Sequence, residues 1–299
     1  MLVNLVDGID YTKFRKYKYY TVTQTFLKER RRFMIDEVVK VLNDVKGKMP
    51  LIHVITNYVV MNDNANALLS FGASPAMVMS PEEAYDFTAI SNALYVNIGS
   101  INNEIKQTII NSVSSASVHK IPVILDPVGC AAIKSRIDFV KMLLKLGSIS
   151  IIKGNGGEIK ALSGKNANVK GVDSLDDNGI MEACIKLAQK TNTVVVSTGK
   201  EDYISDGKKV VIVKNGTPLF AKITGAGCTL GAIMSATSAV SDDKIIAALT
   251  ALLAVNIAGE LAEKECKLPG TFRAKFINNL YIINPDIIKK HANFEVLKV

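Results

Sequence analysis

Short runs of consecutive apolar residues alternate with segments of helical periodicity through the middle of this chain. The apolar runs lie at 51–56, 76–79, 93–98, 122–126, 149–153 and 193–198. Each run is continuous instead of alternating with polar residues, which is typical of strands buried on both faces. Segments with apolar residues three and four apart separate the runs, at 62–71, 81–91, 102–119, 135–146 and 175–190. The alternation predicts an α/β fold, in which a mostly parallel sheet carries helices on both faces.

The pattern changes near residue 202. Residues 202–205, an Asp206-Gly207 turn and residues 209–213 predict a β-hairpin. Asn215-Gly216 predicts a second hairpin turn that leads into a strand at 219–222. Helical segments follow at 225–240, 243–264, 271–280 and 285–291. We therefore expect antiparallel strands at one edge of the parallel sheet, all within one domain.

The basic residues are concentrated at the start of the chain. The sequence has 36 Lys and Arg residues against 28 Asp and Glu residues, a net charge of +8. Residues 1–32 hold eight of the basic and three of the acidic residues, and so account for +5 of that charge. We divide the chain into a basic N-terminal extension, residues 1–32, and a single domain, residues 33–299. The extension is either a solvated segment that runs into a first helix or an electrostatic tether to RNA or anionic lipid.

Several classes of protein are disfavoured by the cysteines, histidines and apolar runs. The four cysteines form no C-x-x-C pair and the three histidines share no short motif, so neither a zinc site nor a disulfide framework is predicted. The uncharged run 223–241 is rich in small residues, and 245–259 is short for a bilayer, which favours buried helices over a membrane hairpin. We expect a cytoplasmic protein that does not associate with a membrane.

Polar residues at the ends of the predicted strands are the candidate site, because open α/β sheets bind ligands at the carboxyl ends of their strands. Asp126 ends one apolar run, and its carboxylate is suited to Mg²⁺ or to orienting a water. A turn before Pro127 is the other interpretation. Glu158 opens a helix after a glycine-rich loop, where a carboxylate is favourable anyway because of the helix dipole. The hydroxyl of Thr198 ends a further run, within reach of a phosphate.

The strongest single feature is residues 224–229, which read Thr-Gly-Ala-Gly-Cys-Thr before a long helix of small residues. Glycines let the backbone approach a ligand, and the free N–H groups of a helix start favour an anion. This arrangement predicts a cradle for a transferring phosphoryl group, and the alternative is a tight turn that allows close helix packing. The chain has no G-x-x-x-x-G-K-[ST] motif and no early G-x-G-x-x-G motif, which disfavours Walker-type NTPases and Rossmann dehydrogenases.

Segments along most of the chain match one known family in order. They are 50–57, 69–77, 96–99, 122–129, 154–158 and 224–228. In these segments the chain resembles the hydroxyethylthiazole kinase family of ribokinase-like kinases. The resemblance implies a ribokinase-like three-layer sandwich and a kinase that uses ATP and Mg²⁺. The implied reaction transfers the γ-phosphate to the primary alcohol of 4-methyl-5-(2-hydroxyethyl)thiazole, which feeds thiamine biosynthesis. It also implies a homotrimer with thiazole pockets at the subunit interfaces, and no requirement for nucleic acid.

The resemblance assigns candidate roles residue by residue. The substrate positions match Asn57, Met77 and Gly225; the nucleotide positions match Lys153, Asn155 and Thr198; the magnesium and phosphate region matches Asp126 and Glu158; and the catalytic positions match Gly225, Ala226, Gly227 and Cys228. Cys228 stands where many ribokinase relatives carry an aspartate base. Two interpretations are open: the helix start lowers the thiol pKa and makes Cys228 the base, or the thiol only shapes the pocket.

The chain departs from the family pattern in places. Lys153 stands where the family usually has arginine, and lysine lacks the planar fork that grips phosphate with two nitrogens. Residues 156–157 are Gly-Gly where small non-glycine residues are usual, and residues 1–32 match no part of the family. One alternative function is a ribokinase-like kinase for another small alcohol, such as a hydroxymethylpyrimidine or a sugar. Another is a basic RNA- or membrane-associated protein that acts through the extension.

Overall fold

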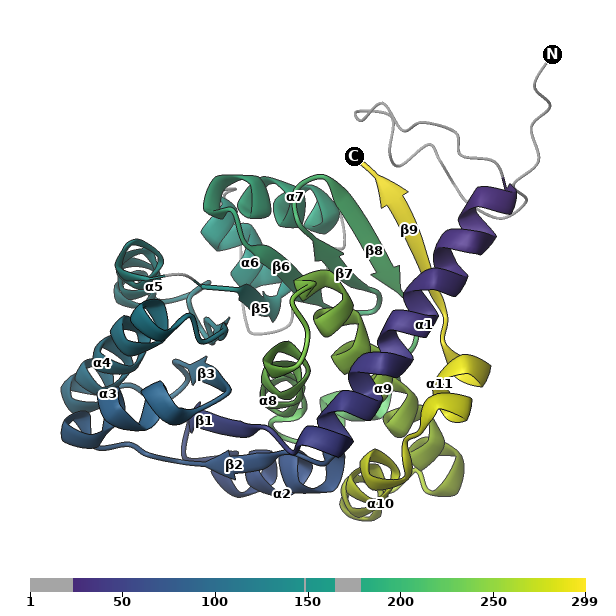
Figure 1. The fold of residues 1–299 in the computed structure, drawn as a ribbon, viewed down its shortest axis with the longest axis horizontal. Helices are drawn as coiled ribbons and strands as arrows, with labels where there is room; N and C mark the ends of the chain where they lie inside the picture. The colour runs from purple at the N-terminus through teal and green to yellow at the C-terminus, as the bar shows by residue number, and fades with distance from the viewer. Residues whose placement is uncertain (1–23, 148, 165–178) are drawn as a thin grey trace.

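The strands of this protein form one mixed sheet. The computed structural model describes residues 24–147, 149–164 and 179–299. Within them the sheet has nine strands in the order β2-β1-β3-β4-β5-β6-β7-β8-β9. The strands are β1 (Leu51–Ile55), β2 (Ser74–Ala76), β3 (Ala93–Asn97), β4 (Val123–Asp126), β5 (Ile151–Asn155), β6 (Val194–Thr198), β7 (Asp202–Ser205), β8 (Lys209–Val213) and β9 (Phe294–Lys298). β1 to β6 pair in parallel and β7 to β9 pair antiparallel. The predicted α/β fold is confirmed (Figure 1).

Helices cover both faces of the sheet. They are α1 (Gln24–Lys48), α2 (Met61–Phe71), α3 (Pro81–Ile90), α4 (Asn103–His119), α5 (Lys134–Leu146), α6 (Gly156–Ser163), α7 (Ile180–Thr191), α8 (Ala226–Ala239), α9 (Lys244–Glu265), α10 (Pro269–Ile282) and α11 (Pro285–His291). Neighbouring residues of one strand enter different cores, as the two-residue period of a strand requires. Val54 packs in the core with α1, α8 and α9, and Ile55 packs in the core with α4 to α7. The protein is therefore a three-layer sandwich.

The antiparallel edge differs in part from the sequence prediction. The hairpin of β7 and β8 is present, but the strand expected at 219–222 is wrong, because Pro218–Lys222 is a 3₁₀ helix. Its first turn has a proline, and the Thr217 side chain accepts a hydrogen bond from Leu219 N, both of which favour a helical start. The strand that pairs with β8 is β9, from the C-terminal end of the chain.

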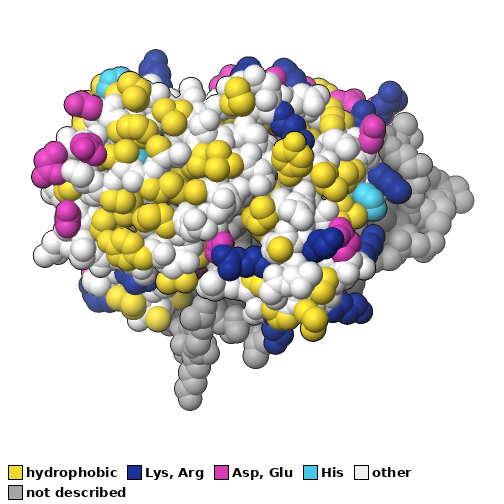
Figure 2. Space-filling view, turned by 90° about the horizontal axis from the view of Figure 1, so that it is seen from below, with side chains coloured by type: hydrophobic (Ala, Val, Ile, Leu, Met, Phe, Trp, Pro, Cys, Tyr) yellow, Lys and Arg dark blue, Asp and Glu magenta, His cyan; other side chains and the backbone are white. Residues whose placement is uncertain are grey.

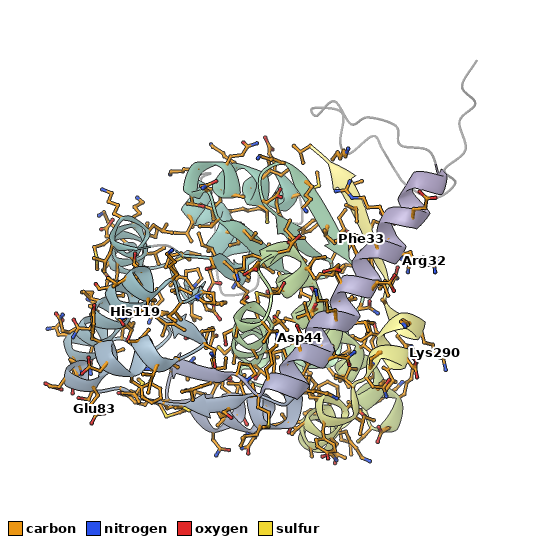
Figure 3. The ribbon with its side chains drawn as sticks, in the orientation of Figure 1. Arg32, Phe33, Asp44, Glu83, His119 and Lys290 are labelled. Atoms are coloured by element: carbon orange, nitrogen blue, oxygen red, sulfur yellow. The ribbon has the colours of Figure 1, made fainter. Side chains whose placement is uncertain are left out.

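Helix α1, near the start of the described residues, packs against the C-terminal end of the chain. It runs without a break from Gln24 past residue 32, and its face of Met34, Val38 and Leu42 is buried in the core. Arg31 donates to the carbonyl of Ala292 at 2.8 Å and lies over the ring of Phe294, so α1 packs beside β9. Figures 1 and 3 show this helix crossing α9, with Phe33 and Asp44 along its length. The division at residue 32 stays a prediction, and residues 1–23 lie outside the described residues.

Helix α9 is the one described helix that is long and apolar enough to cross a membrane. Its most apolar window has a mean hydropathy of 2.0, and 89 % of that window is buried inside the protein. Burial of this extent is what the central helix of a globular domain shows. Both uncharged runs found in the sequence thus lie in neighbouring core helices, α8 and α9.

Candidate active site

Polar side chains meet at the carboxyl ends of the parallel strands. Asn97 and Asp126 end β3 and β4, Lys153 lies in β5, and Asn57 follows β1. All four residues are buried, although the strands that carry them are otherwise apolar. Parallel strands bring their carboxyl ends to one edge of the sheet, so residues distant in sequence become neighbours. The start of α8 lies at the same edge, because Cys228 contacts both Asn57 and Asn97.

Asp126 is held by one of its two carboxylate oxygens. Oδ2 accepts hydrogen bonds from Tyr95 Oη at 2.9 Å, Asn97 Nδ2 at 3.2 Å and Lys153 Nζ at 3.1 Å. Oδ1 is buried and has no hydrogen-bond partner. A buried carboxylate oxygen without a donor is unusual in a native protein, and such an atom is commonly explained by a ligand or ion.

Lys153 and Asp126 form a buried ion pair, with 4 % and 1 % of their surfaces exposed. Burial lowers the pKa of Lys153, but the charges of Asp126, Cys228 and Glu158 raise it more, and the net direction is upward. The ammonium therefore stays protonated. Its Nζ is 3.2 Å from the point where a Cβ on Gly227 would lie, so the charge faces the start of α8.

Glu158 fixes the loop at the start of α6. It forms a capping box with Asn155: Asn155 Oδ1 accepts from Glu158 N, and Glu158 Oε2 accepts from Asn155 N, both at 2.9 Å. Its other oxygen accepts from Gly129 N at 2.8 Å, which ties the loop after β4 to that after β5. Burial and then the Asp126 charge raise the pKa of Glu158. Glu158 thus caps the start of α6 and also lies close enough to Asp126 to feel its charge.

These carboxylates fit a magnesium site that a nucleotide completes. Within the described residues no three His, Cys, Asp or Glu side chains gather as a metal cage. Mg²⁺ is usually held by one or two carboxylates together with substrate phosphates and waters. The unbonded Oδ1 of Asp126 and the nearby carboxylate of Glu158 could supply such a partial set of oxygen ligands.

The first turn of α8 lacks internal partners. Gly225 precedes it with φ of 80°, and no side chain caps the helix. The first hydrogen bond into the helix runs from Thr229 N to Gly225 O, so the N–H groups of residues 226–228 have no intrahelical acceptor. A Cβ on Gly225 would lie 2.2 Å from Val60 Cγ1. Glycine is therefore required here by both conformation and space, and the turn can receive an anion.

Cys228 lies in this turn and is half-buried. Its Sγ accepts hydrogen bonds from Asn97 Nδ2 at 3.2 Å and Asn57 Nδ2 at 3.5 Å. Burial, followed by the Asp126 charge, raises the pKa of the thiol, while Lys153 and the two amides lower it by less. The net direction is opposite to the lowering expected from a helix start alone.

A family profile and individual relatives agree with this geometry. The profile of the hydroxyethylthiazole kinase family matches residues 42–286. Hydroxyethylthiazole kinase 2 of Clostridium botulinum is 48 % identical over 256 residues, which are 85 % of this chain and 97 % of the relative. Hydroxyethylthiazole kinase of Clostridium kluyveri is 50 % identical over 259 residues, 86 % of this chain and 96 % of the relative. The chain belongs to the hydroxyethylthiazole kinase family.

Solved structures support the same family and fold. The hydroxyethylthiazole kinase protein of Pyrococcus horikoshii superposes with a TM-score of 0.82 and 35 % identity, over 88 % of this chain and 100 % of that one. A ribokinase-like superfamily protein of Enterococcus faecalis, only 14 % identical, has a TM-score of 0.58 over 82 % of this chain and 88 % of that chain. The second match shows the fold alone, and it extends the ribokinase-like architecture beyond the hydroxyethylthiazole kinase family.

Other residues predicted from the sequence lie around this network. Thr198 ends β6 beside Asn155, and its Oγ1 donates to Gly154 O at 3.4 Å. Met77 follows β2 and is half-buried against the core that includes α8. Ala226 and Gly227 lie in the first turn of α8. The structure thus places all the predicted residues along one edge, and it leaves their individual roles as proposals.

Three residues of the site were not assigned a role from sequence. Asn97 bonds to Cys228, Asp126 and Tyr95, and its position at the end of an apolar run could have identified it. Tyr95 lies inside an apolar run and carries no such signal. Arg136 donates to Val128 O and Gly99 O from α5, a contact between elements that only the fold brings together.

The histidines play no part in this network. His53 is buried, and its ring nitrogens contact Thr88 Oγ1 and Val78 O, both at 2.8 Å. His119 lies near the C-terminal end of α4, where its Nδ1 contacts Ser115 O (Figure 3). Burial lowers the pKa of His53, so it is a neutral, structural residue.

Proposed function

We propose that this chain transfers the γ-phosphate of ATP to the primary alcohol of 4-methyl-5-(2-hydroxyethyl)thiazole. One observation carries the proposal: the first turn of α8 has N–H groups without partners, beside the Lys153 ammonium and the half-buried Cys228. A phosphoryl group needs stabilisation of charge while it moves, and aligned N–H groups and a cation supply it. Membership of the hydroxyethylthiazole kinase family supports the choice of alcohol.

In this proposal the nucleotide and Mg²⁺ lie over the ends of β4 to β6. Lys153, Asn155 and Thr198 contact the nucleotide, and Asp126 Oδ1 and Glu158 hold Mg²⁺ together with the phosphates. The metal neutralises phosphate charge when it is bound. Lys153 is already close to the turn of residues 225–227, so it can interact with a phosphate that enters the cradle.

The alcohol lies on the other side of the cradle, lined by Asn57, Met77 and Gly225. Cys228 faces it and, with its pKa raised, supplies a neutral thiol in the free protein. This direction supports a pocket-shaping role for Cys228 over that of the base. A Cys228→Ser variant distinguishes the roles, because near-normal kcat eliminates the base, whereas a large fall in kcat with unchanged KM favours it.

We also propose a homotrimer with thiazole pockets at its interfaces. Tyr58 and Val59 directly follow Asn57, and 64 % and 68 % of their surfaces are exposed. Leu69 on α2 and Ile90 on α3 are also exposed. Seen from below, the molecule has apolar side chains gathered on its surface (Figure 2). A contiguous exposed apolar surface is typical of an interaction site, and these residues are our candidates for it. Light scattering of the full chain is expected to give three times the 32.4 kDa of one subunit.

The test of the reaction is a phosphorylation assay on a panel of alcohols. We expect Mg²⁺-dependent transfer to the thiazole alcohol, and little transfer to a hydroxymethylpyrimidine or a sugar. Turnover of one of those alcohols without turnover of the thiazole would overturn the substrate assignment and retain the kinase. The reaction is placed in the cytoplasm, where the four free cysteines would remain reduced. We propose that the reaction requires neither nucleic acid nor a membrane.

A further inference from the structure

Tyr95 connects the Asp126 carboxylate to the helix that begins at the cradle. It belongs to β3, but its side chain points into the core that includes α8, and it is completely buried. In the part of the chain that the structure describes, Tyr95 is the one tyrosine among the largest fully buried side chains. A buried tyrosine hydroxyl needs a hydrogen-bond partner. Its partners are residues of the site, which is not the case for an ordinary core aromatic.

The Tyr95 hydroxyl is one of three donors to the Asp126 carboxylate. It donates to Oδ2 at 2.9 Å and accepts from Asn97 Nδ2 at 3.1 Å. Lys153 and Asn97 donate to the same Oδ2, so three donors converge on one carboxylate oxygen and none on the other. This asymmetry fixes the rotation of the carboxylate and keeps Oδ1 unbonded.

The same side chain also packs against α8. A Cβ on Gly231 would lie 2.5 Å from Cε2, 2.6 Å from Oη and 2.7 Å from Cζ of Tyr95. These distances are too short for any side chain at residue 231, so the glycine makes room for the phenol. Gly231 lies three residues after Cys228 in α8. Tyr95 thus contacts both the carboxylate and the helix whose first turn forms the cradle.

We propose that Tyr95 is a positioning residue for magnesium. Its hydroxyl holds Asp126 so that Oδ1 stays available to the ion. Its contact with Gly231 sets the separation between the Asp126 carboxylate and the cradle. The inference rests on the proposed function, because it assumes that Asp126 binds the ion that accompanies the nucleotide. It adds a residue that touches neither substrate nor metal. Hydrogen-bond partners of metal ligands typically change metal affinity or activity by about 10-fold to 100-fold when they are removed.

The experiment compares Tyr95→Phe with wild type by calorimetry of ADP binding over a series of Mg²⁺ concentrations. The variant keeps the ring that fills the space at Gly231 and loses only the hydroxyl. We expect the Mg²⁺ concentration for half-maximal enhancement of ADP binding to rise about 10-fold. ADP affinity without Mg²⁺ should stay at the wild-type value. Tyr203→Phe is the matched control, because it removes a tyrosine–carboxylate contact of 3.1 Å, to Glu201, in the antiparallel part of the sheet.

A second variant, Gly231→Ala, displaces the hydroxyl without removing it and should shift the Mg²⁺ dependence in the same direction. If both variants only lower the melting temperature and leave the Mg²⁺ dependence unchanged, Tyr95 is structural and the proposal is overturned. Failure of the proposed function gives a different result: wild type itself then does not phosphorylate the thiazole alcohol, or its ADP binding does not respond to Mg²⁺.

Discussion

Helices α8 and α9 follow each other in the chain and both are buried on nearly all sides, yet they begin differently. Asp243 caps α9: one carboxylate oxygen accepts from Ile245 N at 2.9 Å and from Ile246 N at 3.1 Å. Helix α8 follows Gly225, in the left-handed region, and no side chain caps it. The N–H groups of a first turn need acceptors, and the sequence supplies them only for α9.

The start of α9 is therefore structural, whereas the N–H groups at the start of α8 are left free to bind a ligand. The capped start of α9 needs nothing from outside the chain. The start of α8 lies instead at the carboxyl edge of the sheet, beside the buried charge of Lys153, where an anionic ligand can supply the missing acceptors. Stability should therefore depend on the α9 start, and catalysis on the α8 start.

The largest effect is expected from Lys153→Met, which removes the cation beside α8. It leaves the Asp126 carboxylate buried without its ion-pair partner, a change that typically costs about 3–5 kcal/mol. We expect the free energy of unfolding in urea to fall by that amount and kinase activity to be lost. A double variant with Asp126→Asn has no unpaired charge, so it should regain most of the stability but none of the activity. A loss below about 1 kcal/mol in the single variant would contradict a buried ion pair here.

A pH effect of similar size is expected from Asp202, the buried carboxyl that contacts α9. Its oxygens accept from Asn256 Nδ2 at 2.7 Å and Gly199 N at 3.0 Å. Burial raises its pKa from 3.8 to about 6, although Asn256, Gly199 and Lys153 oppose the rise. The folded protein thus binds this proton more tightly than the unfolded chain does, and the associated stability is present below about pH 4 and is lost as pH rises through 6.

At about 1.4 kcal/mol per pKa unit, the loss is about 3 kcal/mol. The measurement is urea unfolding of wild type and Asp202→Asn between about pH 4 and about pH 7. As the pH rises, the free energy of unfolding of wild type should fall relative to that of Asp202→Asn. A constant difference would mean that Asp202 has the same pKa in the folded and unfolded protein, as an ordinary surface carboxyl has.

These buried carboxyls show how far the sequence alone can predict such a protein. Asp126 was predicted because it ends an apolar run, and parallel strands align their ends whatever the details of packing. The parallel strands were predictable for the same reason, since each apolar run is a local signal. β9 was missed because Phe294–Lys298 pairs with Lys209–Val213, and nothing local in either segment indicates that partner.

Inside the site, the sequence could not predict properties that depend on tertiary contacts. Tyr95 matters because α8 crosses it at Gly231, and no spacing in the sequence encodes that crossing. The direction of the Cys228 pKa was also not predictable, because burial and the charge of Asp126 outweigh the helix start. Residue types at strand ends thus predict which groups gather, and packing decides their protonation and orientation.

Gly225→Ala tests the open start of α8 directly. The new Cβ would meet Val60 at 2.2 Å, and the backbone conformation with φ of 80° disfavours alanine, so the first turn has to move. A displacement of about 1 Å in a catalytic group can cost about 100-fold in rate. We expect kcat/KM for the thiazole alcohol to fall by about that factor, as measured by steady-state kinetics.

Gly164→Ala is the matched control for this change. Gly164 has φ of 84°, but a Cβ there would meet nothing within 4 Å, at the C-terminal end of α6. It shares the conformational cost of about 1–3 kcal/mol without the steric clash. Its kcat/KM should stay near that of wild type. Equal losses of activity in the two variants would mean that lower stability, and not the position of the first turn, causes the effect.

The smallest effect is expected from Asp243→Ala, which opens the start of α9. Loss of an N-terminal cap costs about 1 kcal/mol, and the free energy of unfolding should fall by that amount. Since this turn contacts no proposed ligand, kcat/KM should not change, and Mg²⁺ with ADP should raise the melting temperature of the variant as much as that of wild type. Asn102→Ala removes the cap of α4, a 2.8 Å bond from Ile105 N, and should behave alike. If Asp243→Ala instead weakened ADP stabilisation, both helix starts would belong to the ligand site, and a capped start could no longer be distinguished from an open one by function.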